Sequence, residues 1–167
     1  PFLGDALAWI KSNTPKDSTL LADWSYGHLI RAKAQRKALV YNPPDVDAFK
    51  PGDDDAKLIF KVGSYEVKDK PYYDTKSLGE LSNPDDSRLV ASVMLANDSM
   101  TASSELKAKG ISYIFTTVND VDSKPLYAAI VPYDGQQVLV DQMNALAQLN
   151  GFSLVYNDSV SAVYKVD

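Results

Sequence analysis

The chain has 167 residues, of which 45% are hydrophobic and 23% charged, which is the composition of one soluble globular domain with a single core. Its 22 acidic and 17 basic residues give a net charge of -5, so the sequence argues against nucleic acid as a partner. Cysteine is absent and His28 is the single histidine, which excludes disulfides and zinc sites built from Cys and His and disfavours a serine hydrolase.

The first third of the chain reads as alternating helices and strands. Apolar residues at helical spacing predict an amphipathic helix over residues 2–13, which Asn13-Thr14-Pro15 ends. Residues 19–22 predict a short buried strand that runs into Asp23–Gly27, and residues 28–34 predict a second helix. A further strand is expected over 37–41.

The rest of the chain divides into an irregular stretch and a regular one. Residues 42–83 are rich in proline and glycine and predict loop, with one strand near 58–62. Helices are expected over 84–96, from 98 or 99 to 109, and over 136–149; strands are expected over 111–116, 152–156 and 161–166. This interleaving favours a mixed α/β fold in one compact domain spanning residues 1–167.

The most informative segment is Asp23–Gly27, because it places several hydrogen-bonding side chains where a strand ends. Open α/β sheets build their sites at such ends. Trp24 offers an indole N–H, while Ser25 and Tyr26 offer hydroxyls, so together they are suited to hold a small polar group such as an alcohol. The alternative is that Trp24 and Tyr26 are core aromatics beside a turn glycine, Gly27.

This segment resembles a variant of the WWDYG signature of the STT3/AglB oligosaccharyltransferases. Trp24, Tyr26 and Gly27 match the signature, whereas Asp23 stands at its first Trp and Ser25 at its Asp. Neighbouring residues of a strand point to opposite faces, so Asp23 is not expected to replace an acceptor at position 25. The surroundings also match: Asn13-Thr14-Pro15 precedes the strand, and Ile30 and Arg36 follow it.

A second stretch, residues 119–130, resembles the family's DK motif. The spacing departs from the family pattern and suggests a variant with an inserted residue, pairing Asp120 with Lys124 and Ile130. The alternative is a polar loop that precedes a strand.

The resemblance covers the chain from residue 2 to at least Ile130 and implies the soluble C-terminal globular domain of a short archaeal AglB, the central core unit without added β-rich modules. The implied enzyme transfers a polyprenyl-linked oligosaccharide to Asn in Asn-x-Ser/Thr at the extracytoplasmic face of the membrane. The implied multi-pass region, absent from this chain, carries the divalent metal (Mn or Mg), the catalytic carboxylates and the lipid-linked donor. The isolated domain is thus expected to be inactive and to recognise the acceptor's Ser or Thr hydroxyl through Asp23–Gly27, with the DK region alongside.

Two other classes of protein fit the same residues. One is a stand-alone extracytoplasmic carbohydrate- or peptide-binding module with an aromatic platform made of Trp24, Tyr26, Tyr72 and Tyr73. The other is a soluble hydrolase that pairs Asp23 with Asp120 or Asp122, in the manner of glycosidases.

Overall fold

The computed structural model describes residues 3–42, 61–62, 65–66, 81–95, 99–123, 127, 146–148 and 150–167. Its centre is a five-stranded mixed sheet with the strand order β2-β1-β5-β7-β6. The strands are β1 (Thr19–Leu21), β2 (Lys37–Ala38), β5 (Ile111–Thr117), β6 (Phe152–Asn157) and β7 (Ser161–Val166). A two-stranded sheet pairs β3 (Lys61–Val62) with β4 (Tyr65–Glu66). The α/β class expected from the sequence is confirmed.

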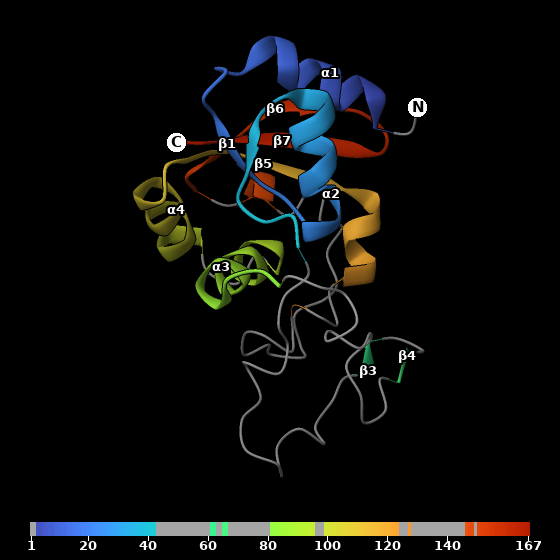
Figure 1. Cartoon of the computed structure of the whole chain (residues 1–167). Helices are drawn as coiled ribbons and strands as arrows, with labels where there is room; N and C mark the ends of the chain where they lie inside the picture. Colours follow the sequence, from blue (N-terminus) through green and yellow to red (C-terminus); the bar gives the residue numbers. More distant parts are fainter. Residues whose placement is uncertain are drawn as a thin grey trace.

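Helices lie on both sides of the five-stranded sheet (Figure 1). On one face, α1 (Gly4–Asn13) and the π-helix Ile30–Ala34 bury residues such as Ile10 and Ile30 against the sheet. On the other face, α3 (Pro84–Met94) and α4 (Ser99–Ala108) bury a second cluster that includes Val90. Since β5 is covered on both faces, its residues are buried or half-buried along the whole strand, without the alternation of a strand that has one exposed face.

The strand order places a topological switch point beside β1. β2 and β5 both run parallel to β1 and flank it. The chain passes from β1 to β2 through α2 (Trp24–Leu29) and the π-helix, whereas it reaches β5 after α3 and α4 on the opposite face. The carboxyl ends of the three parallel strands therefore meet at one edge of the sheet, where open α/β sheets place their ligands.

Most elements agree with their local sequence signals. Asn83 caps α3 by accepting a hydrogen bond from the backbone N–H of Asp85 at 2.9 Å, and Pro84 occupies the first turn. Gly110 follows α4 with φ +71°, the left-handed conformation that suits glycine after a helix. The closing hairpin β6–β7 is also as expected. The helix expected over 136–149 falls mainly on residues that the structure does not describe. Of this range, residues 146–148 are described and form one 3-10 turn.

One expectation is wrong: the segment that follows β1 is not a strand end. Asp23 is the N-cap of α2, which begins at Trp24, four residues before the helix expected at 28. Ser25 and Tyr26 therefore project from a helical turn, and the alternation of a strand does not apply to them. The residues that follow have low helix propensity, but the capping side chain at position 23 stabilises the first turn and so favours the helix.

The hairpin turn contains a pair of ionisable groups whose pKa values are shifted in opposite directions. Burial, reinforced by a hydrogen bond to the Asp158 carboxylate, raises the pKa of Tyr156 to about 12. Burial acts to raise the pKa of Asp158, but hydrogen bonds from Val160, Tyr156 and Ser161 outweigh it and lower that pKa.

These shifts predict how the hairpin responds to alkaline pH. The pKa of Tyr156 in the folded chain lies above its unfolded value of about 10. The folded state is therefore stabilised below pH 10, and this stabilisation is lost as the pH rises through 12. Wild type should therefore lose stability relative to Tyr156→Phe between these two values. Thermal unfolding of both chains across this range provides the measurement, because the remaining tyrosines are common to both. A difference in melting temperature that stays constant to pH 12 would contradict the shift.

Candidate site at the carboxyl edge of the sheet

The carboxylate of Asp23 is a buried junction between two distant parts of the chain. Asp23 is 1% exposed. It accepts hydrogen bonds from the backbone N–H of Ser25 at 2.8 Å, from the Ser25 hydroxyl, and from the hydroxyl of Tyr127. The last contact joins the N-terminus of α2 to the stretch that resembles the second motif. Asp23 therefore orients the start of α2 rather than facing solvent.

A second buried chain of hydrogen bonds runs from Tyr26 to Asp120. The Tyr26 hydroxyl lies 2.9 Å from the Thr117 hydroxyl, which in turn donates to the Asp120 carboxylate at 2.9 Å. Since Thr117 has one hydroxyl proton and gives it to Asp120, Tyr26 is the donor of the first bond. Asp120 is 1% exposed and also accepts from the backbone N–H of Thr117 at 2.9 Å.

This environment keeps the Tyr26 phenol protonated. Burial is the largest cause that raises its pKa, and the negative charges of Asp120 and Asp23 act in the same direction. Tyr26 is thus a neutral hydrogen-bonding group at physiological pH, without basic or nucleophilic character.

The structure brings together the two stretches that the sequence singled out. Both bridges are long in sequence: Tyr26 meets Thr117 across 91 residues, and Asp23 meets Tyr127 across 104. Sequence reasoning missed Thr117 and Tyr127 as members of this site. The one available signal was position, since Thr117 ends the clearest strand and Tyr127 lies within residues 119–130.

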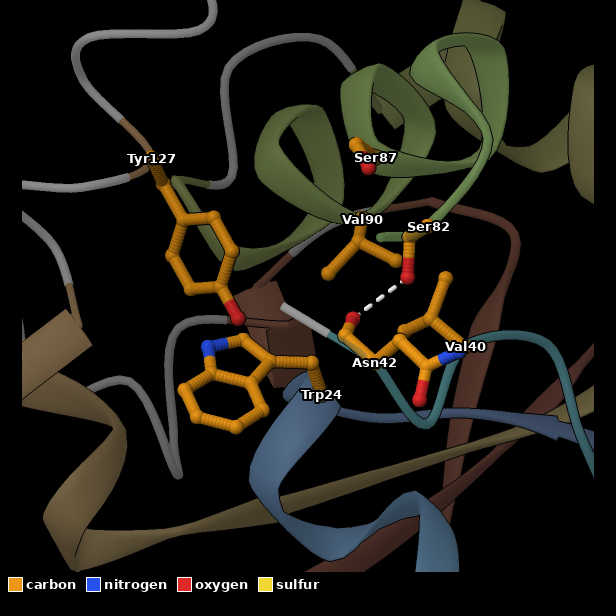
Figure 2. A pocket seen from close by; sticks show the side chains of 7 residues that line it. All are labelled: Trp24, Val40, Asn42, Ser82, Ser87, Val90 and Tyr127. Carbon is orange, nitrogen blue, oxygen red and sulfur yellow. Dashed lines mark hydrogen bonds between the residues drawn. The ribbon is translucent and has the colours of Figure 1, made fainter. Parts of the chain in front are cut away.

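Trp24 lines a small hollow at this edge (Figure 2). The hollow has about 180 Å³ of empty space, part of it open to solvent, and its lining residues are Trp24, Val40, Asn42, Ser82, Ser87, Val90 and Tyr127. Its enclosed part has room for about one water molecule, so the hollow is a small recess and not a preformed ligand pocket. In Figure 2 the hydroxyl end of Tyr127 points toward the indole of Trp24.

Gly27 lets α2 approach the backbone that leaves β2. A Cβ atom at this position would lie 2.1 Å from the Val40 carbonyl oxygen and 2.6 Å from the Tyr41 Cα. These are backbone atoms, which a rotamer change does not move away. Gly27 is therefore required by close packing, and it places Trp24 beside Val40 at the hollow.

The remaining residues of the expected site do not come together around one shared pocket in the described part of the chain. Trp24 packs against the core on the side of α3, whereas Tyr26 packs against the core on the side of α1, so the two rings do not form one flat platform. Ser25 is exposed, with its hydroxyl bonded to Asp23. Lys124, Ile130, Tyr72 and Tyr73 lie outside the described residues, as does the side chain of Asp122.

These groups offer hydrogen-bonding atoms that are already paired within the chain. The carboxylates of Asp23 and Asp120 are buried and bonded to hydroxyl groups of this chain. Among the described residues, no three His, Cys, Asp or Glu side chains come together as a metal site.

The fold and the site define a layered α/β domain with a small polar hollow at the carboxyl edge of its parallel strands. The structure is similar to the crystal structure of the C-terminal globular domain of the oligosaccharyltransferase AglB from Archaeoglobus fulgidus, with a TM-score of 0.58 and 17% sequence identity. The match covers 99% of this chain and 97% of that chain. The resemblance drawn from the sequence is thereby confirmed at the level of the fold.

Sequence comparisons add no further relative. No protein-family model matches the chain, and no curated protein matches its sequence. In the part of the chain that the structure describes, no helix is both long enough and apolar enough to cross a membrane.

Proposed function

We propose that this chain is the acceptor-recognition domain of an oligosaccharyltransferase that transfers a polyprenyl-linked oligosaccharide to Asn in Asn-x-Ser/Thr. In this proposal the domain binds the acceptor segment at the carboxyl edge of the sheet, where Asp23–Gly27 recognises the Ser or Thr hydroxyl. Catalysis, the divalent metal and the lipid-linked donor belong to a multi-pass membrane region of the same protein. The domain by itself is inactive and sits at the extracytoplasmic face.

The observation that carries the proposal is the fold match over nearly the whole chain, together with where the WWDYG-like segment lies. That segment starts α2 at the switch point of the sheet, next to the hollow. Asp23 and Tyr26 are tied to Tyr127 and Asp120 of the second stretch, so the two motif-like regions form one unit. A site built to bond a hydroxyl rejects side chains that lack one, because its own polar groups are then left unpaired.

The test is glycan transfer to an Asn-x-Thr peptide by membranes that carry the full-length protein. Trp24→Ala removes one wall of the hollow and is expected to reduce transfer at least about a hundredfold, the loss typical of a central aromatic anchor. Tyr26→Ala is expected to reduce transfer as well, because it breaks the link from α2 to Thr117 and Asp120.

The matched control is Trp9→Ala. Trp9 is the second tryptophan of the chain and stacks on Tyr156, with ring centroids 5.4 Å apart, away from the hollow. The Trp9→Ala variant should leave KM for the peptide unchanged when it is expressed at the same level as wild type. Unchanged transfer in both Trp24→Ala and Tyr26→Ala would refute the proposal, as would a parent gene without membrane-spanning segments.

A further inference from the structure

The segment over residues 24–44 is basic in a chain that is acidic overall. It contains four Lys or Arg residues and the single histidine but no Asp or Glu, whereas the whole chain has 22 acidic and 17 basic residues. The described part of this segment forms α2, the π-helix and β2. Arg36 is buried and binds carbonyl groups at two helix ends, which leaves Arg31, Lys33 and Lys37 as exposed cations.

The helical run formed by α2 and the π-helix has a buried side and an exposed side. Residues four apart, Tyr26, Ile30 and Ala34, pack into the core that also contains residues of α1. Figure 1 shows the run in blue next to α1. We refer to its exposed residues as the outer face, which consists of His28, Leu29, Arg31, Ala32 and Lys33.

The ring of Tyr41 supports two side chains of the outer face. The guanidinium carbon of Arg31 lies over this ring, 4.5 Å from its centroid, as a cation–π contact. His28 packs against the same ring, with the two centroids 5.4 Å apart. Neither Arg31 nor Lys33 has an acidic partner among the described residues, so the N–H groups of both are available to bind an anion.

The neighbouring elements do not cancel this charge. Helix α1 adds Lys11 in its last turn, while its Asp5 lies in the first turn at the opposite end. The loop after α1 carries one exposed charge of each sign, on Lys16 and Asp17, and Asp23 is buried. The acidic excess of the chain lies beyond residue 42, and charges more than about 10 Å away are largely screened at 0.1 M salt.

Leu29 indicates what kind of anionic partner fits the outer face. It is 39% exposed, between cationic neighbours on a helix. At a membrane interface, an apolar side chain enters the boundary between headgroups and acyl chains, while Lys and Arg reach the lipid phosphates. An acidic polypeptide would bind the cations but has no need of the leucine. The combination therefore favours a membrane.

We propose that the outer face binds the anionic headgroups of a membrane, with Leu29 in the headgroup boundary and Arg31 and Lys33 bound to lipid phosphates. This inference rests on the proposed function for the presence of a membrane beside the domain. It adds a surface that takes no part in acceptor recognition. Because the same helical run begins at Trp24, docking holds the carboxyl edge of the sheet close to the bilayer.

The first experiment measures how the 167-residue chain co-sediments with phosphatidylcholine vesicles that contain or lack phosphatidylglycerol. Binding is expected only to the anionic vesicles and should weaken as salt rises. Lys33→Gln should weaken it about fivefold, the contribution of one cation near an anionic surface. The matched control is Lys107→Gln, because Lys107 is exposed in the last turn of a helix on the other face of the sheet. Equal losses in both variants, or no binding by wild type, would overturn the proposal.

The second experiment separates a membrane from an acidic polypeptide. Leu29→Ala should weaken binding to the anionic vesicles about tenfold, because a partly inserted side chain loses three carbons. Leu154→Ala makes the same change at a side chain that is 44% exposed on β6 and should leave binding unchanged. Polyglutamate is the comparison probe, since it offers negative charge without an apolar layer. If wild type binds polyglutamate as tightly as vesicles and Leu29→Ala changes neither, the membrane proposal is wrong.

Vesicle binding does not depend on glycan transfer, so the two proposals fail separately. If Trp24→Ala transfers glycan normally, the proposed function fails whatever the vesicles show. If Trp24→Ala abolishes transfer while Lys33→Gln and Leu29→Ala bind vesicles like wild type, the acceptor site stands and the outer face is not a membrane surface.

Discussion

Replacing Gly27 by alanine is expected to destabilise the chain by at least about 3 kcal/mol, which lowers the melting temperature by roughly 10 °C. The added Cβ would lie 2.1 Å from the Val40 carbonyl oxygen, so α2 must move away from the backbone that follows β2. Such a shift also loosens the bond from Tyr26 to Thr117 and the packing of Trp24. Stability and acceptor binding should therefore fall together.

Gly4→Ala is the matched control for this prediction. Gly4 is exposed in the first turn of α1, and a Cβ added there meets no atom within 4 Å. Alanine should leave stability unchanged or raise it by up to about 1 kcal/mol, because glycine loses more entropy in a helix. Chemical denaturation of the three chains supplies the comparison. Equal midpoints for Gly27→Ala and wild type would show that α2 does not pack as closely as described.

Replacing Arg36 by methionine should cost about 3 to 5 kcal/mol, because one buried guanidinium holds the ends of two helices. Its Nη2 donates to the carbonyls of Lys11 and Thr14, both at 2.6 Å, at the end of α1. Its Nη1 donates to the carbonyls of Ala34 and Gln35, at 3.2 and 3.0 Å, at the end of the π-helix.

The charge matters as well as the number of bonds. Helix carboxyl ends carry partial negative charge and leave carbonyls unpaired, so a cation between two such ends stabilises both. Arg36 also donates through Nε to the Thr14 hydroxyl at 2.9 Å. Methionine fills similar space, yet it leaves the described carbonyl groups without this donor.

Two variants separate this effect from a general loss of charge. Arg36→Lys keeps the charge but lacks the planar fork, so it should recover only part of the stability. Lys37→Met removes a neighbouring exposed charge and should change stability by less than about 0.5 kcal/mol. The midpoints of urea unfolding rank the variants. A midpoint for Arg36→Met within error of Lys37→Met would refute the bridging role.

Elements with local signals could be predicted from the sequence. Helix α3 begins after the capping residue Asn83 and has Pro84 in its first turn, and α4 ends shortly before Gly110. The signals for the start of α3 and the end of α4 therefore lie within a few residues of the helix ends. β5 and the hairpin β6–β7 are apolar or β-branched runs bounded by polar turns. Arg36 belongs to the resemblance in sequence, but its physical role lies in contacts with residues as far away as Lys11.

The start of α2 shows where local reasoning fails. Trp24, Ser25 and Tyr26 are poor helix formers, and the preceding apolar strand suggests that the extended chain continues. The helix forms because Asp23 caps it, because Tyr127 fixes that carboxylate, and because Gly27 allows the helix to pack. One of these three causes, the aspartate cap, was visible in the local sequence.

The residues of the candidate site also fall into two groups, those that local sequence could identify and those that only the folded chain reveals. Trp24, Tyr26, Gly27 and Asp120 could be named from the sequence, because they belong to short patterns with recognisable chemistry. Thr117 and Tyr127 could not, because their roles depend on which hydroxyl meets which partner after folding. Pairings across 91 and 104 residues have no local signature.

The sequence by itself determined the α/β class, the order of most elements and the resemblance to an oligosaccharyltransferase domain, because capping residues, apolar periodicity and short motifs act over a few neighbouring residues. The tertiary structure decided that Asp23 is a buried cap, that Trp24 and Tyr26 face different cores, and that α3 contributes Ser87 to the hollow. These features depend on the free energy of burying and pairing polar groups from distant segments, which only the folded chain brings into contact.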